Sequence, residues 1–259
     1  MNKSKILRKL KRWGIKILFI IFLFFLWWII YKLQIWPRWL FPSPFKVFKS
    51  IKYGLERGTI IWGIIISMKR IAIGFGFSLV AGSILGFLLA KNKLLDQTVG
   101  FLILGLQTLP SICWLPLALL WFGLNEQAII FVIIMGAILS ITISVESAVK
   151  NIPPLYLRAG RMLGAKGFKL YQYIIFPAIL PSFITGIKHG WSFAWRSLMS
   201  GEMLFITVGL GQLLMMGREL NDMAQVMAVM LIIIAIGIIF DKLIFGFAED
   251  VLRKRWGYK

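Results

Sequence analysis

The sequence predicts an all-α integral membrane protein with six transmembrane helices, and two observations support this prediction. Of the 259 residues, 59% are hydrophobic and only 15% are charged, and the mean hydropathy is +0.83. A water-soluble domain of this length could not bury so much apolar surface, so lipid must be its main solvent. The hydrophobic residues also gather in runs of roughly 20 residues, the length at which a helix crosses the hydrocarbon core.

Six hydrophobic runs are candidate spans. They cover residues 17–31, 71–90, 99–122, 128–145, 174 to about 197, and 223–245. A further apolar piece, residues 203–217, is shorter and rich in glycine, and we interpret it as a re-entrant or interfacial segment at the outer side. An even number of spans places both ends of the chain on the same side of the membrane.

The basic residues orient the predicted spans. Residues 1–16 hold seven basic residues and no acid, and no small-residue cleavage site follows, so we interpret them as the tail of an uncleaved signal anchor. The "KNKLLD" loop, the loop 150–172 and the C-terminal segment are also basic. Positively charged segments stay in the cytoplasm, which predicts that both termini are cytoplasmic. This distribution of the +20 net charge suits anionic lipid rather than nucleic acid.

One segment conflicts with this orientation, because residues 32–70 would face outward with eight basic residues and one acid. We interpret it as an amphipathic helix that lies on the outer surface with its charges at the headgroups. The predicted organisation is therefore a tail, first span and outer amphipathic segment at 1–69, a five-span core at 70–248, and a basic tail at 249–259.

Two of the predicted spans carry residues with a particular structural meaning. In the second span, Gly82 and Gly86 have the spacing of small residues that allow close helix packing in lipid. In the third span, Pro110 and Pro116 each remove a backbone hydrogen bond. Freed carbonyls in lipid must be covered by protein or water, which indicates either a span that lines an interior path or a tolerated kink.

The loop "RAGRMLGAKGFKLYQYIIFPAILP", residues 158–181, has the pattern of two short helices that meet at Gly164. Leu155, Ala159, Met162 and Leu163 fall on one helical face, and a glycine suits the left-handed turn after them. The loop carries no acid and four basic residues, Arg158, Arg161, Lys166 and Lys169. From the residues alone, it is either a docking device or an ordinary interfacial loop whose charges fix the topology.

The predicted fifth span carries polar and charged residues that share one helical face or flank it. They are Lys188, Ser192, Trp195, Arg196, Met199 and Glu202. Ionisable groups inside a membrane usually face a cavity or each other, so one hypothesis is that these residues line a translocation path whose cations draw an anion. The alternative is that Lys188 and Arg196 snorkel to opposite interfaces, while Glu202 pairs with an outer cation such as Arg218.

The sequence offers no set of residues for catalysis or metal binding. It contains one histidine and one cysteine, and it has neither a nucleophile elbow nor a zinc-binding His-Glu-x-x-His motif. A phosphate-binding Gly-x-x-x-x-Gly-Lys-Ser/Thr loop is also absent from the sequence. A membrane enzyme is therefore disfavoured. An ion-coupled secondary transporter is the less favoured transport alternative. Such folds often break helices at matching positions of two halves, whereas the double-proline break in the third span has no obvious counterpart in the second half of this sequence.

The loop 158–181 resembles the "EAA" loop of ATP-binding-cassette (ABC) importer permeases. That loop reads Glu-Ala-Ala, three residues, Gly, about nine residues, and an Ile-x-Leu-Pro-like end. Here the matching residues are Arg158-Ala159-Gly160, Gly164-Ala165 and Ile175-Phe176-Pro177. Arg158 replaces the glutamate and Gly160 the second alanine. The segments "FPSPFKVF", "QTLPSICWLPLALLWFG", "GWSFAWRSLMSGEML" and "GLGQLLMMGRELND" are similar to the nitrate, sulfonate, taurine and bicarbonate branch, so the resemblance covers nearly the whole chain beyond residue 40.

The resemblance implies a type I ABC importer permease fold with a cytoplasmic coupling helix in the loop 150–172. The residues expected to contact a separate ATPase are Arg158, Ala159, Gly160, Arg161, Leu163, Gly164, Ala165 and Lys166. ATP would then be bound by the partner ATPase dimer, with no cofactor on this chain. A second permease copy, as in a homodimer, and an external solute-binding protein are also implied, in a prokaryotic cytoplasmic membrane.

The resemblance further implies a small anionic solute, such as an aliphatic sulfonate or nitrate. The alternatives are bicarbonate, taurine or a pyrimidine precursor, because similar permeases carry these solutes.

Overall fold

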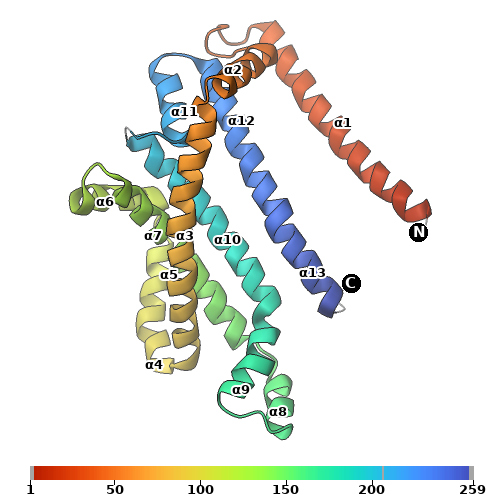
Figure 1. Ribbon diagram of the computed structural model, residues 1–259, viewed down its shortest axis with the longest axis vertical. Helices are drawn as coiled ribbons and strands as arrows, with labels where there is room; N and C mark the ends of the chain where they lie inside the picture. The colour runs from red at the N-terminus through yellow and green to blue at the C-terminus, as the bar shows by residue number, and fades with distance from the viewer. Residues whose placement is uncertain (1–2, 206, 257–259) are drawn as a thin grey trace. The chain divides into compact units, whose positions relative to one another are not determined.

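The structure is a computed structural model that describes residues 3–205 and 207–256. Residues 1–2 of the predicted N-terminal tail and residues 257–259 of the predicted basic C-terminal segment lie outside this description. All of its regular elements are helices (Figure 1). They are α1 (Lys3–Leu33), α2 (Pro44–Glu56), α3 (Thr59–Lys91), α4 (Lys93–Leu95), η1 (Asp96–Gly100), α5 (Phe101–Gln107), η2 (Ser111–Trp114), α6 (Leu115–Phe122), α7 (Glu126–Lys150), α8 (Pro154–Met162), α9 (Phe168–Leu170), η3 (Tyr171–Ile175), α10 (Phe176–Leu204), α11 (Leu210–Glu219), α12 (Met223–Ile239), η4 (Phe240–Phe245) and α13 (Gly246–Trp256).

Five stretches of helix in the described residues are long and apolar enough to cross a membrane, namely Gly14–Leu33, Thr59–Lys91, Glu126–Lys150, Phe168–Leu204 and Met223–Leu252. The bent pair Lys93–Gln107 and Ser111–Phe122 gives a sixth if it counts as one span. These stretches correspond in order to the six spans that the sequence predicts. Helix α11 has ten residues, which is too short for a span and agrees with the interpretation of residues 203–217.

The third predicted span is broken rather than gently kinked. Its two halves meet at an angle of 104°, and the chain between them, residues 108–110, ends at Pro110. Pro116, in contrast, lies in the first turn of α6, where a proline costs no helical hydrogen bond. Only one of the two prolines is therefore at the break, and the other starts the second helix.

The chain divides into two compact units, residues 1–61 with 213–231 and residues 62–212 with 232–259. In the first unit, Val47 of α2 is buried against Ala224 and Ala228 of α12. The indole N–H of Trp27 on α1 donates a hydrogen bond to the Pro42 carbonyl at 3.1 Å. These contacts attach the loop that precedes α2 to the first predicted span.

The second unit is built around α7. Its core consists of apolar side chains from α7, α10, α6 and α3, together with residues after position 231. Small residues allow the helices to approach closely, as expected in lipid. A Cβ atom on Gly86 of α3 would lie 2.6 Å from the Thr142 carbonyl oxygen, and one on Gly82 would lie 3.0 Å from the Ile138 carbonyl oxygen. The close packing predicted for Gly82 and Gly86 is thus present, and α7 is the partner helix.

Helix α3 begins at Thr59, whereas the sequence analysis started the second span at residue 71 and assigned the preceding residues to a surface helix. The structure corrects that boundary: only α2 is separate, and residues 59–70 belong to the long helix. The boundary was misplaced because the charge of Arg70 indicated a solvated helix end. In the structure this side chain is buried and paired with carboxylates, so the helix continues through this position.

Candidate functional site

Helices α8 and α9 form a projecting knob beyond the ends of α7 and α10 (Figure 1). Gly164 has a φ of +82°, which confirms the left-handed turn expected after α8. The amide of Ala165 donates to the Gly160 carbonyl at 2.9 Å and that of Gly164 to the Arg161 carbonyl at 3.0 Å. This pair of hydrogen bonds is the Schellman motif, which satisfies the last carbonyls of a helix.

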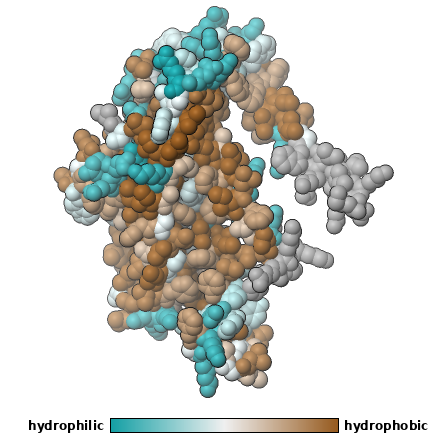
Figure 2. All heavy atoms as spheres, in the orientation of Figure 1, coloured by the Kyte–Doolittle hydropathy of each residue, from teal (hydrophilic) through white to brown (hydrophobic). Residues whose placement is uncertain are grey.

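The surface of the knob combines apolar and cationic side chains, and Figure 2 shows both kinds at this end. Met162 is 88% exposed and Leu163 is 86% exposed. Its four basic residues are exposed, and none of them makes an ion pair with another described residue. No acid occurs in the sequence between Glu146 and Glu202. The knob therefore offers an uncompensated positive surface around exposed apolar side chains.

Gly160 has a packing role that explains why alanine is absent there. A Cβ atom at this position would lie 2.8 Å from Cγ1 of Ile174 and 3.3 Å from Cδ1 of Leu170. Helix α8 thus lies directly on the π-helical turn η3 and on α9. Ala159 and Arg158, its neighbours in the same motif, are exposed and free to contact another molecule.

The six residues of α10 that the sequence analysis proposed for a translocation path have different surroundings in the structure. The Lys188 amine pairs with Asp241 at 3.0 Å and with Glu249 at 3.7 Å. Trp195 is buried in the core, and Met199 packs against the same core. Ser192 is exposed and donates a hydrogen bond to the Lys188 carbonyl. Arg196 and Glu202 have environments of their own, which are described next.

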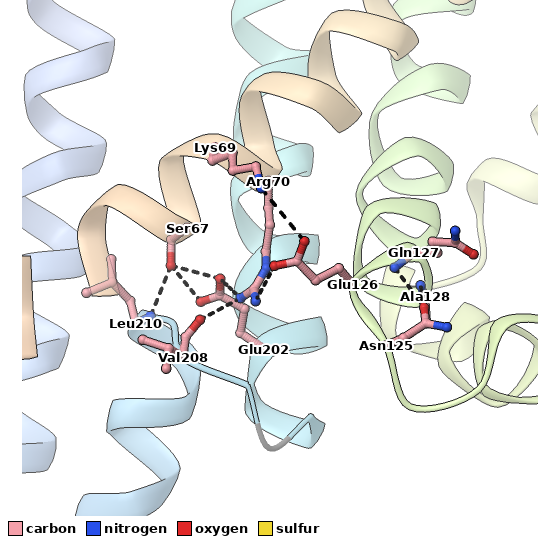
Figure 3. Close-up of polar contacts among 10 residues, drawn as sticks. All are labelled: Ser67, Lys69, Arg70, Asn125, Glu126, Gln127, Ala128, Glu202, Val208 and Leu210. Atoms are coloured by element: carbon pink, nitrogen blue, oxygen red, sulfur yellow. Dashed lines mark hydrogen bonds and ion pairs between the residues drawn. The ribbon is translucent and has the colours of Figure 1, made fainter. Parts of the chain in front are cut away.

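Glu202, Arg70 and Ser67 form a buried polar cluster, and the half-exposed Glu126 lies at its edge (Figure 3). Glu202 is 0% exposed and Arg70 is 2% exposed. One terminal nitrogen of the Arg70 guanidinium lies 2.9 Å from a Glu202 oxygen, and the other lies 3.2 Å from Glu126. The Ser67 hydroxyl lies 2.8 and 2.7 Å from the two Glu202 oxygens. The cation that neutralises Glu202 is therefore Arg70, and the sequence alternative had suggested Arg218.

The same cluster holds the chain that follows α10. The Val208 carbonyl accepts a hydrogen bond from the Arg70 guanidinium at 2.9 Å. The Leu210 amide donates to the serine hydroxyl at 3.0 Å, and the Gly211 amide donates to the Glu202 carboxylate at 3.0 Å. A buried ion pair is stable only when additional hydrogen bonds satisfy its remaining polar atoms. These backbone groups supply them, so the cluster joins α3, α7, α10 and the start of α11.

Arg196 lines a pocket of about 310 Å³ next to the break between α5 and η2. The other polar side chains around it are Gln107, Thr108, Ser111 and Ser140, and the aromatic ones are Trp114 and Phe193. Among the described residues, Arg196 is the only charged one in this lining. Of the six residues proposed for a translocation path, it is the one that this pocket contains.

Several of these neighbours were not singled out from the sequence. Arg70 was assigned to a surface helix, although a basic residue inside the apolar run "IIISMKRIAIGF" signals a buried partner. Asp241 carries the same kind of signal near the end of the last apolar run. Gln107 and Ser140 carry no such signal, because single polar residues in spans are common and only the fold places them around one space.

Comparison with known proteins identifies the family. Residues 78–256 match the family model described as "Binding-protein-dependent transport system inner membrane component". The chain belongs to this family of ABC importer permeases. The permease is accordingly a multi-pass membrane protein and a transport subunit, which confirms the resemblance and the transport function inferred from the sequence.

The most similar relatives of the permease include a Methanocaldococcus jannaschii protein whose name places it among ABC transporter permeases, 37% identical over 73% of this chain and 71% of the relative. The nitrate import permease protein NrtB of Leptolyngbya laminosa is 29% identical over 77% and 71% of the two chains. The bicarbonate transport system permease protein CmpB of Synechococcus elongatus is 28% identical over 77% of this chain and 72% of the relative.

Among solved structures, the permease resembles a chain of the MetNI methionine ABC transporter, with a TM-score of 0.62 and 21% sequence identity. The match covers 76% of the permease and 95% of that chain. The predicted type I importer fold is thereby confirmed.

Proposed function

We propose that this permease imports a small anion, driven by ATP that a separate ATPase dimer hydrolyses on the cytoplasmic side. The permease works as a homodimer, both termini are cytoplasmic, and an external solute-binding protein delivers the solute. No cofactor binds to the permease itself. An aliphatic sulfonate or nitrate is the foremost solute, ahead of bicarbonate, taurine or a pyrimidine precursor.

The observation that carries this proposal is the shape and surface of the knob. A Schellman turn fixes the end of α8, and Met162 and Leu163 beside it are exposed. Exposed apolar side chains next to unpaired cations suit insertion into a cleft of another protein. We therefore assign the coupling function to Arg158, Ala159, Gly160, Arg161, Leu163, Gly164, Ala165 and Lys166.

Two further observations support the choice of an anion. Two of the relatives are named for nitrate and bicarbonate, both of which are small oxyanions. The chain also carries a net charge of +20, and a positive field raises the local concentration of anions.

Cross-linking to the ATPase tests the coupling function. A Leu163→Cys variant, made in a Cys113→Ala background, is expected to cross-link through a bifunctional maleimide to the ATPase subunit that co-purifies with the permease. A Leu120→Cys variant in the same background, on the exposed face of α6, is the matched control and should not cross-link to it. Uptake into proteoliposomes should require hydrolysable ATP. Absence of the Leu163→Cys product, or uptake driven by an ion gradient alone, would refute the proposal.

A second prediction concerns the turn at Gly164. Valine is strained at the positive φ of this residue by about 1–2 kcal/mol, so Gly164→Val should distort the knob and lower ATP-driven uptake by about tenfold or more. Gly164→Asn is the matched control, because asparagine tolerates the left-handed conformation, and it should keep most of the uptake. Equal uptake by the two variants would show that the turn geometry does not matter for coupling.

A further inference from the structure

The pocket beside the broken span is made by three separate parts of the permease. Residues 107–111 contribute the end of α5, the break and the start of η2, α7 contributes Ser140, and α10 contributes Arg196. The break leaves space between packed helices, which is where ligand sites commonly form in helical bundles. The break and its flanks contribute the polar side chains of Gln107, Thr108 and Ser111, and the rings of Trp114 and Phe193 are among the apolar groups of the lining.

The Arg196 side chain is held in place without using its terminal donors. Its Nε–H donates to the Ser192 carbonyl at 3.1 Å, and the guanidinium lies over the Phe193 ring at 4.6 Å. Neither terminal amino group of Arg196 has a hydrogen-bond partner in the part of the chain that the structure describes. The planar fork of a guanidinium fits two oxygens of a carboxylate-like or sulfonate-like group.

The contrast with Lys188 shows why Arg196 is the residue to consider on this helix. Lys188 is neutralised by Asp241 and Glu249, whereas no carboxylate of residues 3–205 or 207–256 lines the Arg196 pocket. A cation without a counter-charge between membrane helices usually faces a cavity or a ligand pathway. The hydroxyls of Ser111 and Ser140 make no hydrogen bond to another described residue and lie on the same pocket.

We propose that this pocket is an anion-binding site of the permease, in which the two terminal amino groups of Arg196 bind a small oxyanion. Gln107, Ser111 and Ser140 supply further hydrogen bonds, and Trp114 bounds the apolar side. The ligand class is a singly charged oxyanion such as nitrate, bicarbonate or a short alkyl sulfonate. This site rests on the proposed function and deepens it, because it places solute selection within the membrane part as well as in the binding protein.

Cysteine labelling in the purified full-length permease in nanodiscs tests the site. Ser111→Cys, made in a Cys113→Ala background, is treated with a sulfonate-bearing methanethiosulfonate and, separately, with a trimethylammonium-bearing one. With each rate divided by that reagent's rate on a free thiol in solution, the anionic reagent is expected to react about tenfold faster than the cationic one, because the Arg196 charge concentrates anions in the pocket. Nitrate or methanesulfonate should slow the anionic reagent, and chloride at equal ionic strength should not.

Variants of the arginine decide the outcome. Arg196→Gln should abolish both the preference for the anionic reagent and the protection by nitrate. Arg196→Lys keeps the charge without the fork, so it should keep most of the preference and lose most of the protection. Arg38→Gln, the same change at an exposed arginine elsewhere, should leave both unchanged. If Arg196→Gln labels like the parent, or if neither oxyanion protects, the site is refuted. The assay contains no ATPase, so its failure leaves the import function intact.

Discussion

Replacing Glu202 with glutamine should lower the stability of the permease by about 3–5 kcal/mol. The substitution leaves the Arg70 guanidinium buried without the closer of its two carboxylates, and an uncompensated buried charge is costly. It also weakens the hydrogen bonds that hold Ser67 and the Gly211 amide. Unfolding of the purified protein in detergent, followed by its tryptophan fluorescence, measures the loss.

The Arg70→Gln/Glu202→Gln double variant distinguishes a paired charge from general disruption. Removing both charges leaves no isolated buried ion, because Glu126 is half exposed. The double variant should therefore be more stable than the sum of the single changes predicts, by about 0.5–3 kcal/mol. Glu56→Gln is the surface control. Glu56 pairs with Lys52, and the side chains of Lys52 and Glu56 are 78% and 62% exposed. Glu56→Gln should therefore change the free energy of unfolding by less than about 0.5 kcal/mol. If the losses of unfolding free energy from Arg70→Gln and Glu202→Gln simply add up in the double variant, the pairing is contradicted.

Substituting Gly86 with valine separates α3 from α7 and should strongly reduce the yield of folded permease. The first added carbon would lie 2.6 Å from the Thr142 carbonyl oxygen and 2.7 Å from Cβ of Val145. A backbone atom cannot yield as a side-chain tip can, and overpacking of this kind costs about 1–3 kcal/mol or more. Gly86→Ala should also lower the thermal stability, but by less than Gly86→Val.

Gly76 is the matched control on the same helix. A Cβ atom at this position meets nothing within 4 Å, and alanine is a better helix former than glycine by about 1 kcal/mol. Gly76→Ala should therefore leave the unfolding temperature unchanged or raise it. If Gly76→Ala and Gly86→Ala lower the unfolding temperature equally, close packing of α3 on α7 is not the cause.

The sequence alone determined the membrane class, the order of the predicted spans and the basic knob with its turn at Gly164. These features depend on local properties, namely the length of apolar runs, the positions of proline and glycine, and the absence of acids between Glu146 and Glu202. A run of the right length forms a helix in lipid whatever its neighbours are, because its backbone must satisfy its own hydrogen bonds.

Only the tertiary structure decided which charges meet. Lys188 and Arg196 are two turns apart on one helix, yet one is neutralised by Asp241 and Glu249 while the other lines an acid-free pocket. Glu202 and Arg70 are 132 positions apart in the chain. Ion pairs and pockets depend on which helix faces which, and helix facing is set by packing between distant segments. Apolar periodicity specifies that a face is buried, but not the partner against which it is buried.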